Sequence, residues 1–165
     1  MRKTSEQRKV DLIDSLVAAR RCILEAAQAL SPDRLDMVFL GTWSVKDLLA
    51  HLVGWDYTNL QAVKEILAGQ VPGFFQYYDQ DWESYNRSLV AQYRIEPFSA
   101  LLAEAAGSHQ QLVAFLEALP AKDLVDGRVK REKGRTVTIR NLLRAEASDE
   151  REHAGQVSAF QKEKL

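Results

Sequence analysis

The sequence predicts an all-α protein, a four-helix bundle with long connections and a short extra helix between its second and third long helices. Two observations support this fold: apolar residues recur every three to four positions in four long stretches, and residues that favour helix ends stand at their boundaries. The chain has 165 residues, of which 46% are hydrophobic, and this is enough for one core. We therefore expect residues 1–165 to form a single domain.

The first two long helices have clear start and stop signals. Thr4 and Ser44 can each cap a helix, because a Gln or an Asp stands three residues after them and completes a capping-box pattern. Ser31-Pro32 ends the first run, since a proline disfavours helix in the residue before it, and Gly69 ends the second. The second helix has a broad apolar face, formed by Val45, Leu48, Leu49, Leu52, Trp55, Leu60, Val63 and Leu67.

The second half of the chain alternates helices with polar connections. An aromatic connection, VPGFFQYYDQD, precedes a short helix predicted over residues 82–93. Pro97 fits the first position of the third long helix, because its missing N–H would have no partner there. Residues 120–137 form the most polar stretch and predict a solvated loop or hairpin. The last helix is expected to run from Thr138 to about Lys162.

The charge balance argues against a nucleic-acid or membrane partner. Lys and Arg number 22 and Asp and Glu number 23, so the formal net charge is −1, and no overall field attracts an anionic polymer or lipid surface. The polar stretch does contain a basic cluster, but it lacks interleaved aromatic residues that would stack on bases; it comprises Arg128, Lys130, Arg131, Lys133 and Arg135. No apolar run approaches the roughly 20 residues that span a bilayer, so we expect a cytoplasmic protein.

The last helix carries charged residues on its apolar stripe. Between Leu143 and Val157, the helical spacing places four polar residues on the core-facing side: Glu146, Asp149, Glu150 and His153. A buried charge is costly unless it is paired or bound to a metal ion. This part of the helix therefore either faces a polar cavity or turns out of the bundle.

Three histidines, His51, His109 and His153, lie on or near the core faces of three different helices. Asp149 and His153 are one helical turn apart, so both side chains can reach one point, and both suit a divalent cation. The same spacing also occurs in solvated ion pairs, and a lone histidine on a core face is often simply hydrogen-bonded. The residues alone leave both interpretations open.

Three segments resemble the DinB-like superfamily, which includes damage-inducible proteins and bacterial thiol-dependent transferases. Residues 41–56, GTWSVKDLLAHLVGWD, look like its signature, and residues 149–156, DEREHAGQ, resemble its H-x-x-x-H-x-G-Q segment. Residues 81–86, DWESYN, are similar to the subgroup that includes the colibactin self-protection proteins. The resemblance covers nearly the whole chain and implies a four-helix bundle of DinB-like type.

The resemblance also implies a divalent-metal site, with zinc or nickel as the metal. The family usually binds its metal through three histidines, one on the second helix and two on the last. The matching positions here are His51, Asp149 and His153, so a carboxylate stands in place of one histidine. A carboxylate oxygen can still bind such a metal, although some members of the colibactin-protection subgroup lack the triad altogether.

These observations support two hypotheses for the function. In the first, the chain is a metal-dependent transferase or hydrolase acting on a small electrophile, with Glu146 or Glu150 as proton acceptor. Asp56 would then orient the imidazole of His51. In the second, a metal-free protein binds a reactive small molecule, as in self-protection, in a pocket lined by Phe74, Phe75, Tyr77, Tyr78, Trp82 and Tyr85. A homodimer is also expected, because related bundles often associate through helix faces.

Overall fold

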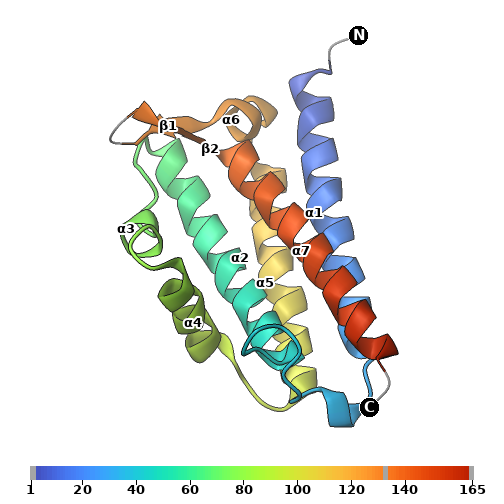
Figure 1. Cartoon of the computed structure of the whole chain (residues 1–165). Coiled ribbons are helices and arrows are strands. Elements are labelled where there is room, and N and C mark those ends of the chain that lie inside the picture. The colour runs from blue at the N-terminus through green and yellow to red at the C-terminus, as the bar shows by residue number, and fades with distance from the viewer. Residues whose placement is uncertain (1–2, 132–133, 164–165) are drawn as a thin grey trace.

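Four long helices lie side by side in the computed structural model, which describes residues 3–131 and 134–163 (Figure 1). They are α1 (Ser5–Gln28), α2 (Val45–Leu67), α5 (Phe98–Ala118) and α7 (Ile139–Lys162). α1 packs mainly on α7, and α2 packs on α5. The predicted all-α four-helix bundle is confirmed. Within the described ranges, no helix is both long enough and apolar enough to cross a membrane.

Hydrogen bonds at the helix starts confirm the predicted caps. Thr4 Oγ1 accepts from the backbone N–H of Gln7 at 3.2 Å, and Ser44 Oγ accepts from that of Asp47 at 3.3 Å. Thr138 caps α7 in the same way. These bonds satisfy backbone donors that have no partner inside the helix, and they fix the residue at which each helix begins.

The directions of the helices explain the long connections. In Figure 1, α1 and α7 run down the page, whereas α2 and α5 run up it. Because α2 and α5 are parallel, no short turn can join them, and the chain has to return along the bundle between them. The returning segment contains α3 (Phe75–Tyr78) and the predicted short helix, α4 (Trp82–Tyr93), which packs along α2.

The polar stretch between α5 and α7 folds as a short helix followed by a hairpin. α6 (Ala121–Asp126) precedes β1 (Arg128–Lys130) and β2 (Thr136–Thr138), and the two strands pair antiparallel. The predicted hairpin is confirmed, whereas the sequence patterns did not indicate α3, α6 or the 3₁₀ turn at Pro32–Arg34. Lys133 of the predicted basic cluster lies outside the described residues.

A layer of polar side chains divides the core into two apolar clusters. One cluster surrounds the Leu30 end of α1, and the other surrounds its Leu12 end. All four long helices contribute buried polar residues to the layer between them, among which are Arg20, Asp56, Asn59, Ser108, His109, Glu146 and Glu150. The expectation that α7 carries polar residues inward is therefore met by Glu146 and Glu150, whereas His153 is half-buried and Asp149 is exposed.

Candidate functional site

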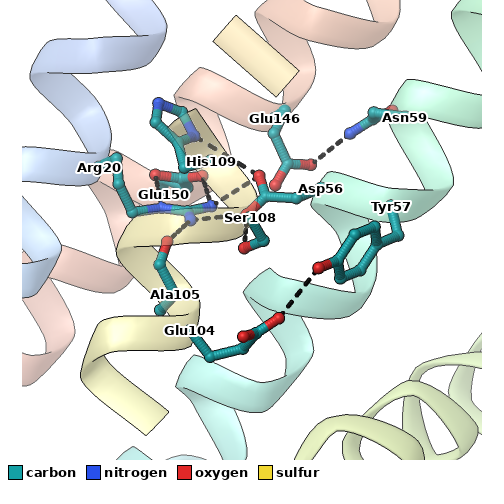
Figure 2. A network of polar contacts seen from close by, with 10 residues as sticks. All are labelled: Arg20, Asp56, Tyr57, Asn59, Glu104, Ala105, Ser108, His109, Glu146 and Glu150. Carbon is teal, nitrogen blue, oxygen red and sulfur yellow. Dashed lines mark hydrogen bonds and ion pairs between the residues drawn. The ribbon is translucent and has the colours of Figure 1, made fainter. Parts of the chain in front are cut away.

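Arg20 lies at the centre of the polar layer and uses all five of its N–H donors (Figure 2). Nε and Nη2 donate to Glu150 at 3.0 and 2.5 Å, and Nη1 and Nη2 donate to Asp56 at 2.7 and 3.0 Å. Nη1 also donates to the carbonyl oxygen of Ala105 at 2.6 Å. The guanidinium group thereby joins α1 to α2, α5 and α7.

Asp56 is held as an anion by its neighbours from α1 and α5. Ser108 Oγ donates to it at 2.6 Å, and His109 Nδ1 lies 3.5 Å from its other oxygen. Burial by itself would raise the pKa of Asp56. The positive charge and hydrogen bonds of Arg20, together with His109, outweigh burial and hold the pKa below its usual value. Because these contacts all lie inside the polar layer, the suggestion that Asp56 orients His51 is wrong.

The same layer contains a set of potential metal ligands. The set consists of Asp56, His109 and Glu150, each of which offers one ligand atom within 4.8 Å of the other two. This spacing can hold a metal ion. No other group of three such residues in the described part of the chain is as compact. Arg20 already forms ion pairs with both carboxylates, however. A second cation here would be repelled by the guanidinium group, so the layer is organised first as an ion-pair network.

A cavity of about 860 Å³ opens between α2, the α3–α4 segment and α7. Its lining includes His51, Asp149 and His153, the three residues predicted to bind a metal, together with Glu146. The rings of His51 and His153 lie edge to face with their centroids 6.1 Å apart. The structure thus brings these side chains from α2 and α7 to one cavity, although they are less compact than the triad around Arg20.

The surroundings of the two histidines suit metal ligands. His153 Nδ1 lies 2.7 Å from Gln156 Oε1, which favours a proton on Nδ1 and leaves Nε2 available. His51 Nδ1 is buried and has no hydrogen-bond partner among the described residues. Burial, helped by the nearby His153, lowers the pKa of His51 to about 3. The imidazole of His51 is therefore neutral near pH 7, as metal binding requires.

Glu146 is the buried acid of this cavity. Asn59 Nδ2 donates to its Oε2 atom at 3.1 Å. Burial raises the pKa of Glu146 well above its ordinary value, and the negative charges of Glu150 and Asp56 raise it further. Of the two suggested catalytic carboxylates, Glu146 lines the cavity, whereas Glu150 is fully buried in the ion pair with Arg20.

Aromatic side chains form one wall of the cavity. Trp55 packs against Phe74, Tyr78 and Tyr85 with ring centroids 5.5 to 5.8 Å apart. Tyr77 is 61% exposed and takes no part in the wall. The members of the suggested aromatic pocket that do line the cavity are Phe74, Phe75, Tyr78 and Trp82.

Arg20, Asn59 and Ser108 were not predicted as site residues from the sequence. A signal was nevertheless present, because Arg20 stands four residues after Leu16 and three before Ile23, both of which are apolar. This spacing places a charged residue on the core face of its helix. A charged residue at such a position is seldom fully buried unless it is paired, so the pattern indicates a partner inside the bundle.

Residues 15–157 match the family model of the DinB superfamily. Because this match spans most of the chain, the protein belongs to the DinB superfamily. No curated protein sequence matches the chain.

Two solved structures share the fold. One is colibactin self-resistance protein ClbS in complex with a dsDNA, with a TM-score of 0.78 and 20% identity over 95% of this chain and 97% of ClbS. The other is YfiT from Bacillus subtilis, described as a probable metal-dependent hydrolase with an unusual four-helix bundle topology. YfiT has a TM-score of 0.70 and 18% identity over 96% of this chain and 88% of its own. At these identities the likeness establishes the fold.

The ClbS complex corrects the expectation that a nucleic acid is not a partner. A bundle of this fold is seen there with a dsDNA, so the exclusion drawn from the charge balance was wrong. The physical reason is that a net charge averages over the whole surface. A value of −1 leaves room for a local basic patch that binds phosphate groups.

Proposed function

We propose that this DinB-superfamily protein is an enzyme that hydrolyses a small molecule, or transfers a group to it, in the cavity between α2, α4 and α7. One observation carries the proposal: the cavity brings together a buried imidazole and a buried carboxyl group whose pKa values are shifted in the direction that favours the uncharged form of each. His51 has its pKa lowered to about 3, and Glu146 has its pKa raised well above the ordinary value. Strongly perturbed groups that share a cleft are typical of catalytic sites.

We assign His51, Asp149 and His153 as ligands of a divalent metal ion, with zinc or nickel as the metal. The assignment is supported by the neutral imidazole of His51 and by the contact of His153 with Gln156, which leaves Nε2 available. YfiT, a bundle of the same fold, is described as a probable metal-dependent hydrolase. When bound, such an ion polarises an electrophilic group and activates a nucleophile.

Other residues of the cavity would transfer a proton and bind the substrate. Glu146 would hold a proton at its carboxyl group and release it to a leaving group, while Asn59 would keep that carboxyl group in place. The aromatic wall around Trp55 would hold the apolar part of the substrate and exclude water.

Turnover of small electrophiles tests this proposal. Protein purified without an affinity tag would be assayed with chromogenic esters, and with 1-chloro-2,4-dinitrobenzene plus a thiol, in the presence of zinc, nickel or a chelator. We expect activity that depends on the metal and falls by a factor of about 100 in Glu146→Gln. Glu117→Gln, at an exposed position on α5 outside this cavity, is the matched control. Full activity in the presence of the chelator would instead favour the metal-free hypothesis.

A second candidate function is the binding of duplex DNA at the hairpin end of the bundle. Residues 127–145 contain seven Lys or Arg residues and one acidic residue. In β1, Val129 is buried while Arg128 and Lys130 are exposed, so the alternation of the strand directs both cations to solvent. Arg140 and Arg144 lie one turn apart at the start of α7. Such a local surplus of positive charge favours contact with phosphate groups, and ClbS is known in complex with a dsDNA.

Fluorescence anisotropy with a labelled duplex of about 20 base pairs tests this second candidate. Reversing two charges in Arg128→Glu/Lys130→Glu should weaken binding by a factor of about 10 or more at low salt and should reduce the salt dependence by about two counterions. Arg21→Glu/Lys162→Glu, at exposed positions of α1 and α7 outside residues 127–145, makes the same change in net charge and should bind like the unmodified protein. If the unmodified protein shows no binding at low salt, this candidate is wrong.

A further inference from the structure

All three tryptophans of the chain line one cavity, the cavity that contains His51 and Glu146. Trp43 precedes α2, Trp55 lies within α2, and Trp82 is the first residue of α4. These side chains come from separate parts of the sequence and are joined there by Phe74 and Tyr78. The negative π-faces of aromatic rings attract cations, and tryptophan does so most strongly.

The charged side chains of the same cavity are mainly acidic. Glu83 Oε2 lies 3.9 Å from Arg87 Nη1 near the exposed start of α4, so the negative charge of Glu83 is balanced by the positive charge of Arg87. Asp149 and Glu152 also line the cavity, and neither forms an ion pair with a Lys or Arg that the structure describes. The lining therefore combines aromatic rings with an excess of negative charge.

A third feature indicates that the cavity is completed by a ligand. His51 is more than nine-tenths buried at the cavity, against the ring of Trp43 at a centroid distance of 4.7 Å. Its Nδ1 atom has no hydrogen-bond partner in the described part of the chain. An unpaired polar atom in a folded core is costly, so such atoms are concentrated where a protein receives a bound partner.

We infer that the cavity binds lipophilic organic cations, such as quaternary ammonium compounds and protonated amines with apolar substituents. This inference names the substrate class of the proposed function and rests on the same cavity. The tryptophan rings would contact the apolar groups around the positive nitrogen. Glu152 would neutralise its charge, together with Asp149 when no metal ion is bound there. An anion of the same shape would be repelled by those carboxylates, and a neutral molecule would forgo both attractions.

A pair of ligands with the same shape tests the inference. Choline and 3,3-dimethylbutan-1-ol differ only in having a positive nitrogen or a neutral carbon at the branch point. Binding of each to the full-length protein would be measured by calorimetry and by tryptophan fluorescence, with a chelator and again with zinc. We expect choline to bind about 10-fold more tightly than the alcohol in the presence of the chelator. Benzyltrimethylammonium, which adds an aromatic ring, should bind more tightly still.

Two pairs of variants show whether the preference arises in this cavity. Trp82→Leu removes an aromatic ring from the lining and keeps an apolar side chain, and Tyr77→Leu makes a similar change at an exposed position outside it. Glu152→Gln removes a charge from the lining, and Glu117→Gln does so on α5. The cavity variants should each reduce the preference for choline by a factor of about 3 or more, and the two controls should keep it.

The outcomes separate this inference from the proposed function. Equal binding of the two ligands, or binding of neither, overturns the inference. So does a preference that both cavity variants retain. Equal binding would still leave a small-molecule cavity in place, and the turnover assays with neutral electrophiles would decide the proposed function independently. Conversely, a preference for cations without any turnover would support the inference and count against an enzyme.

Discussion

A guanidinium group inside a bundle is tolerated only when its donors have acceptors, and Arg20 meets this condition with two carboxylates and a carbonyl group. We expect Arg20→Met to lower the free energy of unfolding by about 3–5 kcal/mol, because it leaves Asp56 and Glu150 buried without a cation. Urea denaturation followed by circular dichroism measures this change.

The neighbouring arginine provides the control for this prediction. Arg21 lies on the same helix but is exposed, so Arg21→Met should change the free energy of unfolding by no more than about 0.5 kcal/mol. Similar losses in the two variants would mean that the Arg20 network contributes no more than an ordinary surface residue. A variant Arg20→Lys should recover only part of the loss, because an ammonium group cannot reproduce two bidentate contacts.

Glu146 should make the protein less stable as the pH rises. Its pKa is raised in the folded state, so above about pH 4.5 the unfolded chain releases this proton while the folded chain keeps it. The free energy of unfolding then falls with pH, by up to about 1.4 kcal/mol per pH unit, until the folded carboxyl group ionises. The protonated carboxyl group of Glu146 thus makes its full contribution to stability below the pKa that it has in the unfolded chain. This contribution is lost as the pH rises through the pKa that it has in the folded protein.

Replacement by an amide isolates this effect. Glu146→Gln keeps the shape and the contact with Asn59, so it should be more stable than the unmodified protein at pH 7 to 8 and nearly equal to it at pH 4. Urea denaturation across this pH range measures the difference, with the exposed Glu152→Gln as the control. A difference that does not vary with pH would show that Glu146 has an ordinary pKa. A stabilised but inactive variant would fit a group kept for function at a cost in stability.

Several residues of the site could be predicted from the sequence, but the residues that they contact could not. Periodicity alone placed Glu146 and Glu150 on the inward face of α7, and both are buried. Periodicity could not predict that Glu150 pairs with Arg20 while Glu146 lines the cavity. The partner of each side chain depends on which helix lies opposite that face of α7. The metal ligands His51, Asp149 and His153 remain a prediction, supported by their shared cavity and awaiting a metal measurement.

At the scale of the elements, the packing of α4 on α2 depends on one glycine. A Cβ atom added at Gly54 would lie 2.7 Å from Leu89 Cβ, which is too close for two carbon atoms. Gly54→Ala should therefore separate the two helices and lower the free energy of unfolding by about 1–3 kcal/mol, although alanine is the better helix former. The emission of the adjacent Trp55 should change as well, since its indole donates to Asn86 on α4.

Gly107 is the matched control for this prediction. It lies within α5, and a Cβ atom there would have nothing within 4 Å among the residues that the structure describes. Gly107→Ala should raise the free energy of unfolding by about 0.5–1 kcal/mol through helix propensity alone. Thermal denaturation of both variants measures the contrast. A gain in stability from Gly54→Ala would show that α4 packs on α2 less closely than described.

The starts of α1, α2 and α7 could be predicted almost to the residue because they carry side-chain caps, whereas α5 has none and begins at Phe98, one residue after the predicted Pro97. Thr4, Ser44 and Thr138 each have an oxygen that replaces a missing backbone partner, and this is a local property of the sequence. α3 and α6 have four and six residues. Such short helices cannot show an apolar period, and their stability depends on the surfaces against which they pack. For this reason they were not predicted.

At the scale of the whole molecule, the parallel course of α2 and α5 determines where the site lies (Figure 1). The returning α3–α4 segment brings Phe74 against Trp55 of α2 and adds Trp82 to the lining, so that a cavity forms where four antiparallel helices with short loops would leave none. Lengths of connections indicate such a return, but they do not say which face the segment covers. The aromatic residues could thus be selected from the sequence, whereas their common cavity with His51 could not.

Metal binding should stabilise the whole bundle, because the predicted ligands lie on two helices. Zinc held by His51 on α2 and by Asp149 and His153 on α7 would bind the folded state alone. At a free metal concentration 100 times the Kd, this adds about 2.7 kcal/mol to the free energy of unfolding, or roughly 5–10 °C to the Tm of a chain of this size. Calorimetry after treatment with a chelator, and then with zinc, nickel or magnesium, measures the shift. Magnesium should shift the Tm very little, since it prefers oxygen ligands.

Two histidine variants then decide where the metal binds. His153→Ala removes a ligand at the cavity, and His109→Ala removes one from the compact triad beside Arg20. His109→Ala should lower the Tm of the metal-free protein, because it leaves a void in the core, but the shift induced by zinc should persist. In His153→Ala the shift should disappear. The reverse pattern, with the shift lost only when His109 is replaced, would mean that the metal enters the polar layer despite Arg20. The cavity would then have to act through its aromatic wall and Glu146 alone.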